Sequence, residues 1–364
     1  GMRLRARREL GKPASATLQA LRALDEEAKA LGSDQERIEL LTMESQTYAR
    51  IGEPQRAEDL AEECVEMAER VGDPALLASA LNRFAITVRN ENPARARTYF
   101  ERALALFQRL GGVRGQARCH NNLGIVAQLE MRPDYGRDSL AMAMTLARAA
   151  GMPDLSGIAA ANLGVIMQRV GEVDRAKELY GDALALFAAV KNSELQLYAL
   201  YNMANLERET GEFASGAELY EATSSLAQRI GQSDVEIGAM AGEGLCLHSI
   251  GKVDAAKAQL SEIESRMSSR SGWFQGRELV DALRVRLAIG DGRIAEAMSI
   301  FETARTTAEG YDMYSVAWLT AACADLLLPH YPEQVLAAVE KYSGQAASLG
   351  FADLIRKYKR LKEL

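Results

Sequence analysis

Asparagines recur at a fixed interval in this sequence, and their side-chain amides have the chemistry to hold an extended chain. Asn122, Asn162 and Asn202 are each 40 residues apart, and Asn82 lies 40 residues before Asn122. An amide both donates and accepts hydrogen bonds, so it matches the N–H and C=O groups of a peptide backbone. If the segments that carry them pack about 10 Å apart as helices, a peptide rising about 3.3 Å per residue meets one asparagine at every third residue.

A structural role is the alternative for the same asparagines, since each amide could bond the turn of its own helix or the neighbouring helix. Asn82 is the doubtful member of the series. Its motif, Asn82-Arg83-Phe84-Ala85, aligns with Asn121 and not with Asn122. One residue is a rotation of about 100° around a helix, so the Asn82 side chain would leave the common stripe.

Arginines near the C-terminal ends of the same segments form a second series, which includes Arg50. In an acidic protein such a series could make a basic stripe suited to acidic side chains. Equally, these residues could be ordinary cations, which are favoured at helix C-termini. The candidate peptide-binding residues are Asn82, Asn122, Asn162, Asn202, Arg89, Arg169 and Arg208.

Residues that carry out catalysis or bind metals form no such pattern. His120, His248 and His330 stand far apart, and only His330 has a carboxylate at helical spacing, Glu333. The 4 cysteines occur singly, which favours small core residues in a reducing compartment, with the cytoplasm as the expected location. Sequence motifs for phosphate loops, serine nucleophiles and zinc proteases do not occur. We therefore expect no enzyme activity, no cofactor and no metal.

The composition bounds the remaining classes of function. The chain has 364 residues, 43 basic and 50 acidic, with a formal net charge of −7, which argues against a general nucleic-acid binder. Its apolar runs fall short of the roughly 18 residues that a membrane span needs, and no secretory leader is recognisable. A peptide or protein segment is the expected partner, without direct contact to nucleic acid or membrane.

The elements that position these residues share their period. Glycines able to end a helix in the left-handed conformation follow one another at 39, 40, 79 or 80 residues, and Lys191-Asn192 and Ser271-Gly272 fill the doubled gaps. With no sustained period-two stretch, the sequence predicts roughly three-quarters helix or more and no sheet. The expected helix pairs are 34–50 with 54–71, 75–90 with 93–110, 114–130 with 133–150, 154–170 with 173–190, 194–210 with 213–230, 234–250 with 253–268, 274–289 with 293–309 and 313–329 with 332–349.

The second helix of each regular pair carries a stripe of close contact. A small residue is followed four positions later by a bulky one in five of six repeats. These positions share a helix face, so two backbones approach there and the bulky side chain fills the space beside them. The small residues are Ala57, Ala96, Gly136, Ala176, Gly216 and Ala256, and the bulky ones are Phe100, Leu140, Tyr180, Tyr220 and Leu260.

Three parts are expected along the chain. Residues 3–32 form an N-terminal partial repeat, 33–268 form six regular helix-pair repeats, and 269–364 form degenerate repeats and a C-terminal capping helix. A polar break at 268–272 separates the last two parts. The final helix, 351–361, is rich in Arg and Lys, as the water-facing side of a terminal repeat requires.

These motifs resemble the tetratricopeptide repeat family. The resemblance rests on Asn162-Leu163-Gly164, Gly171, Ala176, Tyr180 and Ala183, and on their counterparts one period away; it covers roughly residues 34 to 268. The period of about 40 exceeds the family's usual 34, so each helix is longer. Such long repeats are similar to the sensor segments of bacterial signal-transduction ATPases, transcription activators and peptide-sensing regulators.

The resemblance implies an all-α fold, an α-solenoid of stacked antiparallel helix pairs wound into a right-handed superhelix. It also implies that the first helices line a concave groove that holds an extended peptide or partner. The expected function is therefore a non-catalytic peptide- or protein-binding scaffold or sensor module. The alternative is a small-molecule-sensing or oligomerisation module that regulates an attached signalling or DNA-binding domain.

Overall fold

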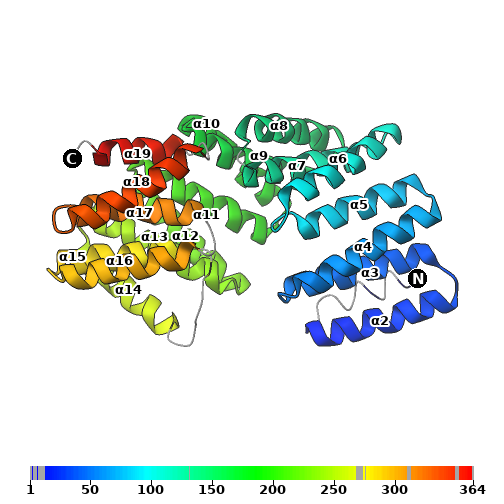
Figure 1. Cartoon of the computed structure of the whole chain (residues 1–364), viewed down its shortest axis with the longest axis horizontal. Coiled ribbons are helices and arrows are strands. Elements are labelled where there is room, and N and C mark those ends of the chain that lie inside the picture. The colour runs from blue at the N-terminus through cyan, green and yellow to red at the C-terminus, as the bar shows by residue number, and fades with distance from the viewer. Residues whose placement is uncertain are drawn as a thin grey trace. The chain divides into compact units, whose positions relative to one another are not determined.

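The computed structural model describes residues 2, 6, 13–130, 132–267, 274, 276–309, 313–348 and 352–362. These residues form helices joined by short turns, with no strand among them (Figure 1). The all-α prediction is therefore confirmed. The predicted polar break at 268–272 lies outside the described residues, as do residues 3–5 and 7–12 of the expected N-terminal partial repeat.

Two compact units make up the chain, residues 1–162 and 163–364. The division falls inside helix α9 (Pro153–Val170), which contributes its first part to unit 1 and its second part to unit 2. It differs from the three parts expected from the repeats, and that three-part organisation remains a prediction.

Unit 1 is a series of helical hairpins in which each helix packs against the next. The odd-numbered helices also pack on one another, α3 on α5 and α5 on α7. They therefore form one layer, and the even-numbered helices form the other. The helices are α2 (Ala14–Ala30), α3 (Asp34–Arg50), α4 (Pro54–Val71), α5 (Pro74–Val88), α6 (Pro93–Arg109), α7 (Val113–Leu129) and α8 (Pro133–Ala149).

Unit 2 repeats this layering, because α11 packs on α13, α13 on α15, α15 on α17 and α17 on α19. The α-solenoid of antiparallel helix pairs is thus present in both units. The helices are α10 (Val173–Ala189), α11 (Ser193–Thr210), α12 (Phe213–Ile230), α13 (Ser233–Ser249), α14 (Val253–Met267), α15 (Arg277–Gly290), α16 (Ile294–Glu309), α17 (Met313–Leu327), α18 (Pro332–Ser348) and α19 (Ala352–Lys362).

The expected helix pairs agree with these bounds to within three residues at each end. Side-chain capping marks the start of α5, α6 and α11. Asn92, for example, accepts a hydrogen bond from the backbone N–H of Arg95 at 3.0 Å, and Asn192 accepts one from Leu195 at 3.1 Å. A side-chain acceptor at this position satisfies one of the free N–H groups of the first turn, so the helix starts just after it.

Left-handed turns close the helices as the glycine series predicts. Gly72, for example, has φ +73° and Gly231 has φ +74°. Lys191 stands where the series lacks a glycine, and it has φ +52°, the only positive φ of a non-glycine residue in the described part of the chain. The turn geometry is thus kept even where the residue type changes.

The stripe of close contact is confirmed, since all six small residues and Phe100, Leu140, Tyr180 and Tyr220 are buried, although Leu260 is only partly so. Glycines of the odd-numbered helices make room for the bulky residues. A Cβ atom on Gly164 would lie 2.7 Å from the ring of Tyr180, and one on Gly124 would lie 2.4 Å from Leu140 Cγ. The Asn-Leu-Gly motif therefore ends in glycine because the paired helix places a large side chain against it.

No helix in the described ranges combines the length and the apolar character needed to cross a membrane.

Candidate functional site

The asparagine series of unit 1 is buried and bonded within the protein. Asn122 and Asn162 are only 8% and 7% exposed. The Asn122 amide donates to Asn82 Oδ1 at 3.3 Å, and the Asn162 amide donates to Asn121 Oδ1 at 3.3 Å. These bonds join neighbouring odd-numbered helices, which is the alternative role that the sequence left open. Peptide contact by these amides remains a prediction, and their burial leaves little surface for it.

A one-residue offset generates this pairing. In each bond the donor is an asparagine of one repeat, and the acceptor is the asparagine one motif position earlier in the preceding repeat. Asn82 is therefore an acceptor, as its counterpart Asn121 is. Forty residues after Asn121 the acceptor position is Ala161, which has no side-chain oxygen. Asn202 donates instead to the backbone carbonyl of Tyr198 in its own helix, at 2.9 Å, and stays half-buried.

The predicted arginines fall into two environments. Arg50 is exposed and Arg89 is half-buried in unit 1. Arg169 of α9 and Arg208 of α11 lie in unit 2 and line one cavity together with Asn202. Three of the seven predicted site residues are thus brought together, and we treat this cavity, called the α9–α17 cavity below, as the candidate functional site.

The α9–α17 cavity has a volume of about 210 Å³ and is enclosed by odd-numbered helices alone. Helices α9 and α11 form one side of it, and α15 and α17 form the other, although α17 begins more than a hundred residues after α11. The lining residues used below are Arg169, Tyr201, Asn202, Asn205, Arg208, Glu209, Glu278, Tyr314 and Trp318.

Arg208 is the centre of a buried polar network. Its side chain is 10% exposed, and its Nε donates to the Tyr220 hydroxyl at 3.0 Å, which in turn donates to Asn205 Oδ1 at 2.6 Å. Arg208 Nη2 also lies 3.4 Å from Glu209 Oε1, and Glu209 accepts from Gln168 at 2.8 Å. Burial alone would lower the pKa of Arg208, but the neighbouring Tyr220 and Glu209 oxygens more than offset it and the pKa is raised. The cation is therefore held permanently in the cavity wall.

Aromatic rings of α17 cover both arginines. The guanidinium carbon of Arg208 lies 4.6 Å from the centre of the Trp318 ring, and that of Arg169 lies 5.0 Å from the Tyr314 ring. Stacking of a guanidinium on an aromatic face is an attractive electrostatic contact. Each of these two arginines thus has an aromatic partner, and the predicted basic stripe for acidic side chains remains a prediction.

Two buried donors in the cavity wall have no hydrogen-bond partner among the described residues. Tyr201 is 7% exposed and Trp318 is 4% exposed, and neither the Tyr201 hydroxyl nor Trp318 Nε1 is bonded. Burial, followed by the charge of nearby Glu278, raises the pKa of Tyr201 well above its ordinary value, so the hydroxyl keeps its proton and remains a donor. Buried polar groups are rarely left unpaired without a reason, and a bound ligand is one such reason.

Sequence reasoning missed Tyr201, Tyr314 and Trp318. Tyr201 had a usable signal, because it stands next to Asn202 at the position that Asn121 and Asn82 occupy in unit 1. Tyr314 and Trp318 had none, since α17 has lost the repeat motif and its position opposite α9 and α11 is a property of the tertiary structure.

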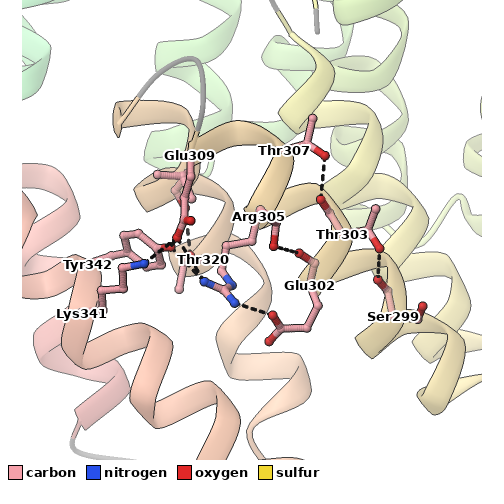
Figure 2. Close-up of polar contacts among 11 residues, drawn as sticks. Ser299, Glu302, Thr303, Arg305, Thr307, Glu309, Thr320, Lys341 and Tyr342 are labelled. Carbon is pink, nitrogen blue, oxygen red and sulfur yellow. Dashed lines mark hydrogen bonds and ion pairs between the residues drawn. The ribbon is translucent and has the colours of Figure 1, made fainter. Parts of the chain in front are cut away.

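Another polar cluster of unit 2 pairs its charges internally, although Arg305 Nε is itself unbonded. Figure 2 shows Arg305 and Glu309 of α16 reaching Tyr342 and Lys341 of α18. Arg305 lies 2.9 Å from the Tyr342 hydroxyl, and Lys341 lies 2.6 Å from Glu309 Oε1. These contacts join α16 to α18, and Arg305, Glu309 and Lys341 each have a partner of opposite charge.

A larger cavity of about 410 Å³ between α14, α15 and α16 is likewise neutralised. Arg284 bonds both Asp281, at 3.0 Å, and Glu264, at 3.1 Å. Arg293 bonds Glu296 at 2.7 Å. These cations have carboxylate partners, and no unbonded aromatic donor such as Tyr201 or Trp318 is among the described residues that line this cavity, so it carries less binding chemistry than the α9–α17 cavity.

The cysteines are buried and free, as expected of core residues. Burial raises the pKa of Cys64, Cys119 and Cys323 to about 12, and that of Cys246 to about 11. Thiols with such pKa values are poor nucleophiles at neutral pH. Among the described residues, no three His, Cys, Asp or Glu side chains gather closely enough to hold a metal ion.

Comparison with known proteins identifies the repeat. A tetratricopeptide repeat family model matches residues 45–71, which cover the end of α3 and all of α4. No curated protein matches the chain in sequence. The resemblance to the tetratricopeptide repeat family predicted from the motifs is thus confirmed, with the family-model match confined to one repeat.

Solved structures share the fold at low sequence identity. One is a Signal Transduction ATPase with Numerous Domains from Pyrococcus horikoshii with a tetratricopeptide repeat sensor, at 14% identity and a TM-score of 0.62; the match covers 89% of this chain and 46% of that one. Another is the apo quorum sensor NprR from B. thuringiensis, at 11% identity and a TM-score of 0.61, covering 91% and 96%. A third is a Rap protein in complex with Competence and Sporulation Factor, at 12% identity and a TM-score of 0.59, covering 99% of each chain.

At sequence identities of 11–14%, the similarity between this chain and these structures is a similarity of fold alone. The chain is therefore an α-solenoid in which residues 45–71 match the tetratricopeptide repeat, and its fold is similar to the folds of these three structures.

Proposed function

We propose that this protein is a non-catalytic binding module that recognises a peptide or protein segment of a partner, with the α9–α17 cavity as the point of recognition. The observation that carries the proposal is the pair of buried donors without a partner, Tyr201 and Trp318, in the wall of a cavity that already gathers Arg169, Asn202 and Arg208.

The chemistry of the wall suits a planar group rich in acceptors. Tyr201 and Trp318 offer donors, and the Oδ1 atom of Asn205 is already occupied, which leaves its amide N–H₂ as a further donor. Asn202 donates to its own helix, so its carbonyl oxygen is left to accept. A backbone amide or a side-chain carboxamide of a bound segment offers the complementary acceptor and donor.

The volume favours part of a chain over a whole small molecule. Pockets for drug-sized ligands measure about 300–1,000 Å³, whereas this cavity measures about 210 Å³. A side chain or a chain end of a larger partner fits that size, with the rest of the segment lying along the odd-numbered helices. The volume therefore supports a peptide or protein partner over the alternative of a small-molecule sensor.

The three solved structures of similar fold support a sensing role in general terms. One carries a tetratricopeptide repeat sensor, one is named a quorum sensor, and one is a complex with Competence and Sporulation Factor. We extend the sensing role, signal transduction and a cytoplasmic location to this chain as part of the proposal.

Trp318 allows a direct test. The chain has 2 tryptophans, so replacing Trp273 by Phe leaves Trp318 as the single fluorescent reporter in the cavity wall. Peptides are selected from a random display library on the wild-type protein, and their affinities are measured by calorimetry. We expect binding to change Trp318 emission, and we expect Tyr201→Phe and Trp318→Phe each to weaken binding by roughly 2- to 12-fold, the loss of one hydrogen bond.

The matched control is Tyr331→Phe, which removes a hydroxyl from a half-buried tyrosine that does not line the cavity. It should leave affinity unchanged. Selected peptides that bind the cavity variants as tightly as the wild-type protein would show that recognition occurs elsewhere.

A further inference from the structure

Helices α5 and α7 of unit 1 have an unusual charge pattern for an acidic protein. Neither contains an Asp or Glu, whereas α4 contains six. Their arginines include Arg83 on α5 and Arg118 on α7, with Arg89 directly after α5. The two helices pack on each other within the odd-numbered layer, so these cations share one side of the unit.

The arginines of α6 show what neutralisation looks like in the same unit. Arg95 pairs with Glu58 and Glu62 of α4, and Arg102 lies 3.2 Å from Glu69 of α4. Three acids of α4 are therefore paired with arginines of α6, and a fourth, Glu63, lies 3.8 Å from Arg37 of α3, so these four have cation partners outside α5 and α7.

Arg83, Arg89 and Arg118 have no side-chain hydrogen bond or ion pair within the described ranges. Arg83 and Arg118 flank a defined contact, because their neighbours Asn82 and Cys119 approach to 3.6 Å between Oδ1 and Sγ. Partial desolvation, followed by the nearby charge of Arg118, lowers the pKa of Arg83, and desolvation lowers that of Arg89. Two like charges are thus held close together without a counter-ion, which an added anion would relieve.

We propose that Arg83, Arg89 and Arg118 form a docking surface for an acidic peptide segment of a partner protein. A peptide fits better than a nucleic acid, because the cluster is short and the protein as a whole, with a net charge of −7, repels a long polyanion. The surface shares no residue with the α9–α17 cavity, so this inference goes beyond the proposed function and stands or falls separately.

The test uses the full chain and a fluorescein-labelled hexaglutamate peptide, with binding followed by fluorescence anisotropy. We expect the wild-type protein to bind the peptide at low ionic strength and to release it as salt is added, since exposed charges are screened beyond about 10 Å at 0.1 M salt. The double variant Arg83→Gln/Arg118→Gln should lose on the order of tenfold in affinity, because two unpaired contact charges are removed at once.

The control is Arg109→Gln/Arg148→Gln, which removes two exposed arginines of α6 and α8 that also have no ion pair among the described residues. It causes the same change in net charge and should leave affinity within about twofold, as expected for a long-range effect of charge alone. Trp318→Phe should not alter hexaglutamate binding, which separates this surface from the cavity.

Three results would overturn the inference. The wild-type protein could fail to bind hexaglutamate at low salt, or the two double variants could lose affinity equally, which would make the effect one of net charge. Tighter binding of a labelled oligothymidylate than of hexaglutamate would replace the peptide by a nucleic acid. Circular dichroism melts of all variants confirm that the compared proteins are folded.

Discussion

Arg89 in unit 1 and Arg208 in unit 2 occupy the same place in the repeat and have opposite environments. Each stands four residues after the position of the motif glycine, at Ala85 and Ala204 respectively. Arg89 is half-buried and has no ion pair with any described residue. Arg208 is bonded to Tyr220 and stacked on Trp318.

This difference separates what the position in the repeat determines about an arginine from what the surrounding helices determine. The motif fixes the helix face on which a side chain begins, because both arginines come from odd-numbered helices at the same register. In unit 2 the polar partners of Arg208 come from its own helix and from Tyr220 of the next helix, α12, whereas the ring that covers it comes from α17. The environment of a repeat position therefore depends on the side chains of the paired helix and on the distant helix that covers it.

Replacing each of these arginines by methionine should give the largest contrast. Arg208→Met removes the cation that Glu209 and Tyr220 face, so we expect a loss of about 3 kcal/mol in the free energy of unfolding, as for a buried pair deprived of one partner. Arg89→Met should change it by about 0.5 kcal/mol or less. Urea unfolding followed by circular dichroism gives both values, and similar losses for the two variants would refute the contrast.

Packing at the motif glycine should matter equally in the two units. Gly124→Ala and Gly164→Ala each place a Cβ within 3 Å of Leu140 or Tyr180, so each should cost about 1–3 kcal/mol through overpacking. Ala176→Leu and Gly136→Leu should fall in the same range, because both residues lie in the stripe of close contact.

Gly181 of α10 is the control, since nothing lies within 4 Å of its added Cβ. Gly181→Ala should stabilise the protein by roughly 0.5–1 kcal/mol, the helix preference of alanine. Thermal melts compare the set, and a stable Gly164→Ala variant would mean that the Tyr180 ring is free to move aside.

The asparagines should separate by unit as well. Asn162→Ala leaves the buried Asn121 without its partner, so we expect a loss of about 1–2 kcal/mol. Asn202→Ala removes a bond to the carbonyl of its own helix and a side-chain contact with Tyr198, both at a half-buried position, and should cost less, about 0.5–1 kcal/mol. A double-mutant cycle of Asn121→Ala with Asn162→Ala tests the contact directly, and strictly additive losses would argue against it.

The smallest expected effect is on the pH dependence of stability, and it comes from two histidines. Burial lowers the pKa of His120 in unit 1, and burial together with Arg286 lowers that of His248 in unit 2. The unfolded chain then takes up the proton first, so stability is unaffected above about pH 6.5 and falls as the pH drops below it towards the folded pKa.

His120→Gln and His248→Gln should each make that fall shallower, as measured by unfolding at pH values between about 5 and 7. Added salt should weaken the contribution of His248 more than that of His120, because only His248 is opposed by a charge. A steeper fall in either variant would contradict the sign of the shift.

Local pattern was enough to predict most of the fold. Helix bounds followed from the period and its left-handed glycines, and the close contacts followed from Ala176, Tyr180 and their counterparts, because all of these act within one hairpin. The candidate site was predicted only in part. Arg169, Asn202 and Arg208 could be picked out by period, but Tyr314 and Trp318 could not, since no local pattern records which helix returns to cover another.

The asparagines also show how far the sequence pattern could predict the contacts. Their period was read correctly, but the bond from Asn122 to Asn82 depends on the 39-residue step that separates Asn82 from Asn121. An offset of one residue decides whether an amide points at a neighbouring helix or away from it, and only the packed structure settles that choice.

Lys191 gives the molecule one turn with a different entropic balance. A left-handed lysine costs about 1–2 kcal/mol of steric strain in the folded state, where the glycine turns of the other repeats have none. The same side chain restricts the unfolded chain, which at a glycine is freer by about 0.4–1 kcal/mol of conformational entropy. The turn between α10 and α11 is therefore nearly as stable as the glycine turns. Its free-energy cost comes less from the conformational entropy that the chain loses on folding and more from backbone strain in the folded state.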